Sequence, residues 1–167
     1  MAFNPKYTIN VNIINLLGKI ETSRQVVMAS PLTAHMIISL RESAKIASTH
    51  HSTYIEGNRL TLDEVRELIK KQTHFPHKQK DEDEVRNYYD ALEYVANEAL
   101  KSNRLTKSII QMLHGLSFHG KAKPTPYRDG QNVIRSGKLV VYIPPKAEDV
   151  NPLMDDLILW VNQMIKE

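Results

Sequence analysis

Residues 52–58 read Ser-Thr-Tyr-Ile-Glu-Gly-Asn, and this stretch decides how the chain is interpreted. Because Ser52 and Glu56 lie four positions apart, a helix through the stretch places the hydroxyl and the carboxylate on one face, a turn apart. Gly57 can end that helix in a left-handed conformation. A carboxylate at a helix end suits the capture of a cationic group or the exclusion of an anion. The alternative is a solvated surface glutamate, which is common at such positions.

Two helices are predicted before and through this stretch. Thr8 is the expected N-cap of the first, whose apolar residues share one face: Ile9, Ile13, Leu16, Leu17 and Ile20. Ser30 and Pro31 are the expected N-cap and first-turn proline of the second, which runs to about Ile55. Its apolar side continues through Leu32, Met36, Ile37, Leu40 and Ala44.

Three further helices follow Asn58. Thr61 and Glu64 form a capping box that starts a short helix carrying Val65, Leu68 and Ile69. After a polar loop over residues 72–80, Asp81 to Asp83 put negative charge at the start of the next helix, where the helix dipole favours it. That helix is expected to bury Val85, Tyr88, Tyr89, Leu92, Val95 and Ala99. Thr106 can cap a third helix, with Ile109, Ile110 and Leu113 toward the core.

The C-terminal part combines a hairpin with one helix. Two short β-prone runs, 133–135 and 139–142, flank Ser136-Gly137, which signals a hairpin turn. Asn151-Pro152 is the expected start of a last helix that runs to Glu167 and bears Leu153, Leu157, Trp160, Val161 and Met164. The predicted fold class is mainly α: a helical bundle with one β-hairpin.

Composition restricts the class of protein. The chain has 167 residues, enough for a single domain with a sizeable core. It has no cysteine, so disulfides and thiolate metal sites are excluded. No apolar run approaches the roughly 18–20 residues that a transmembrane helix needs, and Asn10, Asn12 and Asn15 make the N-terminus a poor signal peptide. We expect a cytoplasmic protein without a membrane partner.

The charge is uneven along the chain. Residues 101–138 carry eight cations against Asp129, a balance of +8 − 1 = +7, whereas the whole chain has a net charge of +3. Two interpretations of this segment remain open. It can be an ordinary solvated basic surface, or a surface that faces ATP phosphates or an acidic target. A nucleic-acid interface ranks last, because stacking aromatics beyond Tyr127 do not alternate with the basic residues.

A series of short motifs extends the pattern of residues 52–58. Arg41 precedes it, and Leu60-Thr61 with a helix follows it. Further along come Leu113-His114, Tyr127-Arg128, Tyr142-Ile143-Pro144-Pro145, and then Val150, Leu153-Met154 and Leu157. In residue type, spacing and order these motifs resemble the Fic family, which transfers AMP from ATP onto protein hydroxyls. The resemblance covers roughly residues 30–165 and implies a Fic-like N-terminal helical bundle.

The resemblance implies roles for residues 52–58. In the family a catalytic-loop His activates the target hydroxyl, Mg²⁺ offsets the developing charge, and an Arg of the same loop holds the ATP γ-phosphate. An inhibitory Glu pairs with that Arg and displaces the γ-phosphate. Glu56 matches this position, Ser52 would hold the helix end, Gly57 would end it and Asn58 completes the motif. An Arg–carboxylate pair is charge-assisted and geometrically selective. Because the pair displaces the γ-phosphate, the α-phosphate is shifted out of line, and a misplacement of about 1 Å can cost roughly 10²-fold in rate.

The predicted hairpin has a counterpart in the family as well. There it is the flap, which pairs with the backbone of the target protein and orients its modifiable side chain. The residues expected to meet the target are Ile134, Arg135, Leu139 and Val140. Adding an extended peptide to an exposed strand edge is a known recognition mode. The alternative is a plain surface hairpin.

The family's catalytic signature, His-Pro-Phe-x-x-Gly-Asn-Gly-Arg, does not occur in this sequence. We therefore expect no catalytic residue here, no tightly bound ATP or Mg²⁺, and an inactive chain when alone. The expected organisation is a single domain over 1–167: helices with the inhibitory motif (1–60), core helices (61–122), loop and flap (123–150), and a helix leading toward a missing catalytic part (151–167). The alternative is a truncated, inactive Fic-derived module for protein–protein interaction or homodimerisation.

Two other patterns are weaker. Residues 115–122 nearly spell a P-loop, but Ala122 offers no hydroxyl to Mg²⁺ and the segment follows a helix rather than a strand. Histidines that suggest a metal lack carboxylates at ligand spacing, so no metal site is predicted. They are His50-His51, His74-x-x-His77 and His114 with His119.

Overall fold

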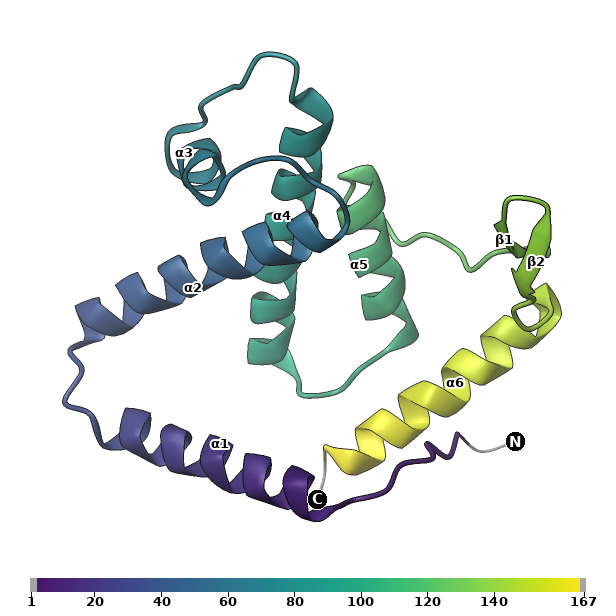
Figure 1. Cartoon of the computed structure of the whole chain (residues 1–167), viewed down its shortest axis with the longest axis horizontal. Coiled ribbons are helices and arrows are strands. Elements are labelled where there is room, and N and C mark those ends of the chain that lie inside the picture. Colours follow the sequence, from purple (N-terminus) through teal and green to yellow (C-terminus); the bar gives the residue numbers. More distant parts are fainter. Residues whose placement is uncertain (1–2, 166–167) are drawn as a thin grey trace. The chain divides into compact units, whose positions relative to one another are not determined.

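The computed structural model describes residues 3–165 and contains, within them, six helices and one two-stranded antiparallel sheet (Figure 1). The elements are α1 (Val11–Ala29), α2 (Ala34–Ile55), α3 (Leu62–Lys71), α4 (Gln79–Lys101), α5 (Lys107–His119), β1 (Ile134–Ser136), β2 (Leu139–Tyr142) and α6 (Ala147–Met164). The expected mainly α class with one hairpin is confirmed. The expected continuation of the last helix to Glu167 lies outside the described residues.

The chain forms two compact units. One is Asn4–Ala44, which contains α1 and the first half of α2. The other contains Phe3 and the described residues from Lys45 onward. The stretch of residues 52–58, the hairpin and α3 to α6 all belong to this second unit.

The first unit contains no buried residue, and its two helix starts differ from the expectation. α1 is capped by Asn10, whose side chain accepts a 3.0 Å hydrogen bond from the Ile13 amide, and not by Thr8. Ser30 closes α1 instead of opening α2: its hydroxyl donates to the Val26 carbonyl at 2.8 Å. These shifts arise because several capping residue types lie within a few positions of each other.

The core of the second unit lies where the end of α2 and the following loop meet α3 and α4. Its buried apolar side chains are Ile46, Leu60, Val65, Leu68 and Val85. Burying each such side chain is worth about 1.5–3 kcal/mol. The predicted capping box is confirmed: Thr61 Oγ1 accepts from the Glu64 amide at 3.2 Å, and Glu64 Oε2 accepts from the Thr61 amide at 2.8 Å.

The predicted stripe of α4 is only partly buried. Val85 is fully buried and Tyr88, Tyr89 and Leu92 are half-buried, but Val95 and Ala99 are exposed, contrary to expectation. α5 packs against α4 and begins at Thr106, whose side chain accepts from the Ile109 amide as predicted.

The turn of the hairpin and the start of α6 both differ from the expectation. Ser136 pairs with Leu139, so the turn residues are Gly137 and Lys138, with Gly137 at φ +60°. α6 begins at Ala147, and Pro152 lies inside it rather than at its start. Glu148 and Asp149 occupy the first turn, where the helix dipole favours acidic residues.

Asn162 joins α6 to the loop before α5. Its side chain donates to the Leu105 carbonyl and accepts from the Leu105 amide, both at 2.8 Å. Trp160, half-buried on α6, meets the ring of Phe3 edge to face at 5.2 Å. Over residues 3–165 no helix is long and apolar enough to cross a bilayer.

Candidate functional site

The last turn of α2 ends as residues 52–58 predict. The Glu56 amide donates to the Thr53 carbonyl and the Gly57 amide to the Tyr54 carbonyl, both at 3.0 Å. Gly57 has φ +99°, a region that residues with a side chain rarely adopt. The helix therefore ends between Ile55 and Gly57 and leaves Glu56 at its tip.

Two polar contacts fix this helix end. Thr53 is buried, and its hydroxyl donates to the Thr49 carbonyl of the preceding turn at 2.9 Å. On a neighbouring face, Ser52 Oγ accepts a 3.0 Å hydrogen bond from the Tyr88 hydroxyl of α4. Ser52 thus ties α2 to α4 one turn before Glu56.

Asn58 is the most extensively bonded residue of the motif. It is 4% exposed, and its Nδ2 donates to the Asp81 carbonyl and to Glu84 Oε2, both at 2.9 Å. Its Oδ1 accepts from the Leu60 amide at 3.0 Å. Both amide protons of Asn58 therefore join the α2–α3 loop to the start of α4, while its carbonyl oxygen forms a hydrogen bond within the loop.

Glu56 lines a cavity of about 430 Å³ together with Ser52, Glu84, Tyr88 and Phe118. Glu56 is exposed, and among the described residues its carboxylate has no hydrogen-bond or ion-pair partner. Two carboxylates, Glu56 and Glu84, thus face a cavity whose lining includes no basic side chain. Such a cavity favours a cationic group over an anion.

The predicted flap is exposed throughout. Every residue of β1 and β2 is exposed, including the predicted target contacts Ile134, Arg135, Leu139 and Val140. Arg135 pairs with Val140, and the register is irregular between Ile134 and Arg135. Within residues 3–165 the two strands pair only with each other, so each has a free edge.

Arg128 closes the base of this hairpin. Its guanidinium donates to the Gly130 carbonyl at 2.8 Å and to the Pro145 carbonyl, which joins the chain segments before β1 and after β2. Gln131 reinforces the closure by donating to the Pro144 carbonyl at 3.1 Å. Arg128 of the Tyr127-Arg128 motif therefore closes the base of the hairpin.

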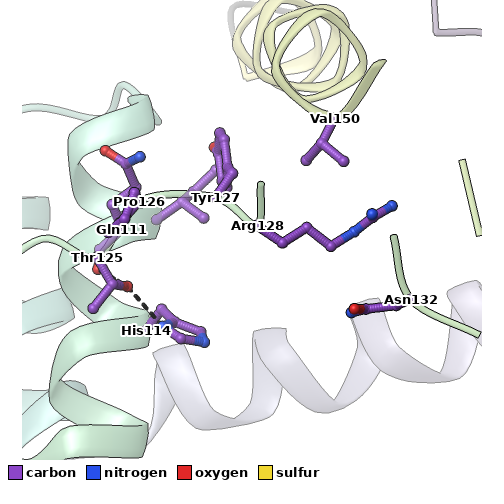
Figure 2. A pocket seen from close by; sticks show the side chains of 9 residues that line it. Gln111, His114, Thr125, Pro126, Tyr127, Arg128, Asn132 and Val150 are labelled. Carbon is purple, nitrogen blue, oxygen red and sulfur yellow. Dashed lines mark hydrogen bonds between the residues drawn. The ribbon is translucent and has the colours of Figure 1, made fainter. Parts of the chain in front are cut away.

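A second cavity, of about 460 Å³, lies beside α5 and the hairpin base (Figure 2). His114 Nδ1 is 2.7 Å from Thr125 Oγ1, and Arg128 extends between Val150 and Asn132. The Tyr127 hydroxyl is buried without a partner among the described residues, and burial, followed by the charge of Asp155, raises the pKa of Tyr127. Sequence reasoning did not identify this cavity, because its walls come from segments far apart along the chain.

Sequence reasoning also missed the burial of Glu82. This side chain is 1% exposed, and it accepts from the Phe75 amide at 2.6 Å and contacts His74 Nδ1 at 2.9 Å. The Phe75 hydrogen bond, with His74 and Arg86, holds the pKa of Glu82 below its usual value despite burial. The predicted acidic start of α4 is confirmed. Glu82 not only interacts favourably with the helix dipole there but also binds the α3–α4 loop through the Phe75 amide.

The two weaker patterns of the sequence have local structural explanations. Residues 115–122 form the end of α5 and a turn, where Gly120 at φ +59° caps the helix. His50 stacks on Tyr54 at 5.8 Å and His114 on Phe118 at 4.8 Å, while His74 contacts Glu82 and His114 also contacts Thr125. No group of three potential metal ligands occurs among residues 3–165.

Comparison with known proteins agrees with the geometry. No family model matches the sequence. A solved Fic family protein from Desulfovibrio desulfuricans G20 is 29% identical over 95% of this chain and 47% of its own, with a TM-score of 0.71. A Fic domain containing signaling protein from Bacteroides thetaiotaomicron VPI-5482 is 23% identical over 93% of this chain and 57% of its own, with a TM-score of 0.73.

The fold is therefore the fold of Fic family proteins. The chain spans about half the length of the two solved structures that it matches.

Proposed function

We propose that this chain is the regulatory and target-docking region of a Fic-type protein adenylyltransferase of the cytoplasm, which transfers AMP from ATP to protein hydroxyls. The observation that carries the proposal is the position of Glu56. Its unpaired carboxylate stands at the tip of α2, beside a cavity without basic side chains, in a chain with a Fic-like fold.

In this proposal Glu56 acts by charge pairing. A guanidinium of the catalytic part occupies the cavity and forms a charge-assisted bond with the Glu56 carboxylate. That guanidinium is then unavailable to the γ-phosphate of ATP, so the α-phosphate is held out of line with the target hydroxyl. ATP, as the AMP donor, and Mg²⁺ would both be bound by the catalytic part, and no residue of this chain is assigned to either.

The hairpin performs target docking in the same proposal. Its free strand edges suit backbone pairing with an extended segment of the target protein. Ile134, Arg135, Leu139 and Val140 would contact the side chains of that segment, while Arg128 keeps the hairpin base closed.

The experiment is a chimaera in which this chain continues into the remaining part of the Desulfovibrio protein. The chimaera and its Glu56→Gly variant are incubated with Mg²⁺ and ATP labelled at the α-phosphate. We expect the variant to label itself at least tenfold more, since loss of the carboxylate releases the guanidinium. Equal or lower labelling would contradict the regulatory role of Glu56.

A second candidate function is a stand-alone protein–protein interaction module that dimerises. The observation in its favour is α1, which buries none of its residues within its own unit, Asn4–Ala44, although Ile13, Leu16, Leu17 and Ile20 lie on one face. Exposed apolar surface of this kind favours association. Sedimentation distinguishes the two candidates: a discrete dimer that Leu16→Glu dissociates supports the module, and a monomer at all concentrations contradicts it.

A further inference from the structure

We infer that Glu84 is a second acceptor for the cationic group that Glu56 binds, and that Asn58 holds the Glu84 carboxylate in position. The inference rests on the proposed function and deepens it, because it makes the cavity a two-carboxylate site. The ligand class is a guanidinium, which can bond to two acceptors at once with its fixed planar set of donors.

The geometry of Glu84 supports this role. The side chain comes from α4 and lines the same cavity of about 430 Å³ as Glu56 from α2. One of its oxygens, Oε2, accepts from Asn58 Nδ2 at 2.9 Å. Its other oxygen has no hydrogen-bond partner within residues 3–165, so Glu84 has remaining capacity to accept.

Asn58 makes Glu84 a fixed rather than a flexible acceptor. Because Asn58 is buried and spends its second Nδ2 proton on the Asp81 carbonyl, its orientation is determined by three bonds at once. The carboxylate of Glu84 is thereby positioned before any ligand arrives. A positioned acceptor loses less side-chain entropy on binding than a free surface carboxylate does.

The aromatic walls of the cavity suit the same ligand class. Tyr88 and Phe118 are among its lining residues, and Tyr88 is fixed by its bond to Ser52. A guanidinium stacks on aromatic faces as well as pairing with carboxylates. An ammonium is a compact point charge without this planar match, so lysine derivatives should bind less well than arginine derivatives.

The test is a titration of the whole chain with arginine amide, followed through the NMR signal of the Gly57 amide. We expect binding in the millimolar range. Glu56→Gln and Glu84→Gln should each weaken it about threefold to fivefold, the range of an exposed ion pair. Gln at position 84 keeps an oxygen for Asn58, so the fold is retained. Glu148→Gln, at an exposed glutamate of α6 outside the cavity, is the matched control and should bind like the wild type.

Each outcome decides one question. If Glu56→Gln weakens binding and Glu84→Gln does not, the inference about Glu84 is overturned while the proposed function stands. If arginine amide does not shift Gly57 in the wild type, or if Glu56→Gln has no effect, the cavity is not a guanidinium site, and the proposed function and the inference both fail. Equal affinity for lysine amide would overturn the assignment of the ligand class.

Discussion

The Tyr88 hydroxyl of α4 donates a 3.0 Å hydrogen bond to Ser52 Oγ of α2, one helical turn before Glu56. The two residues are 36 positions apart in the sequence, so this bond fixes the end of one helix against the middle of another. A rigid helix end matters because the proposed site depends on where the Glu56 carboxylate stands.

Removing this bond should destabilise the second unit modestly. We expect Tyr88→Phe and Ser52→Ala each to lower the free energy of unfolding by about 0.5–1.5 kcal/mol, the net worth of one hydrogen bond. The double variant should cost less than the sum, because either change alone removes the bond. Urea denaturation measures all three. Tyr54→Phe, at an exposed tyrosine, is the control; strict additivity would argue against the bond.

A side chain at Gly57 should lower stability for conformational reasons alone. A Cβ at this position would meet nothing within 4 Å, but φ is +99°. We expect Gly57→Ala to cost about 1–2 kcal/mol of unfolding free energy, the penalty of a left-handed conformation. Gly130 is the matched control, since it also has open space around its Cα and no positive φ. If the two alanine variants are equally stable, the strained helix end does not exist in solution.

Glu82 should make stability depend on acid pH. Its pKa is lowered in the folded state, chiefly by the Phe75 amide. A carboxylate with a lowered folded pKa contributes stability that is fully present above its unfolded pKa of about 4.3 and lost as the pH falls through the folded value.

Glu82→Gln should therefore destabilise the chain near neutral pH and reduce the loss of stability on acidification. Thermal unfolding at several pH values between about 2 and 7 measures both effects. Glu148→Gln, at an exposed glutamate of α6, is the control for the loss of one carboxylate. Parallel pH profiles for wild type and Glu82→Gln would show that the buried contact contributes nothing.

The sequence could predict what depends on neighbouring residues. The capping box of Thr61 and Glu64, the helix stop at Gly57 and the hairpin near Gly137 each follow from local backbone preferences, and all three are present. Helix starts were harder to predict, because Thr8 and Asn10 can both cap and tertiary context chooses between them.

Contacts between distant segments could not be predicted in the same way. Asn58 meets Glu84 across 26 positions, and no local pattern marks Glu84 as part of the cavity. Glu82 resembles its acidic neighbours in the sequence, yet it alone is almost fully buried, since the α3–α4 loop folds over it. The motif located one carboxylate of the candidate site, and the fold added the second.

Asn58 should be the most costly residue of the motif to replace. Asn58→Ala removes three hydrogen bonds and leaves the amide of the buried Leu60 without its side-chain acceptor. We expect a loss of about 2–4 kcal/mol in unfolding free energy, since each lost bond is worth about 0.5–1.5 kcal/mol and a buried unpaired group costs about 1–3 kcal/mol. Asn58→Asp has nearly the same shape as the wild type but a different charge. It keeps the oxygen that accepts from the Leu60 amide and places a second carboxylate next to the carboxylate of Glu84. It should therefore be less stable at pH 7 than at pH 5, whereas Asn58→Ala should not share this dependence. Differential scanning calorimetry of both variants at the two pH values is the measurement, and a stable Asn58→Asp at pH 7 would show that Asn58 and Glu84 do not face each other in solution.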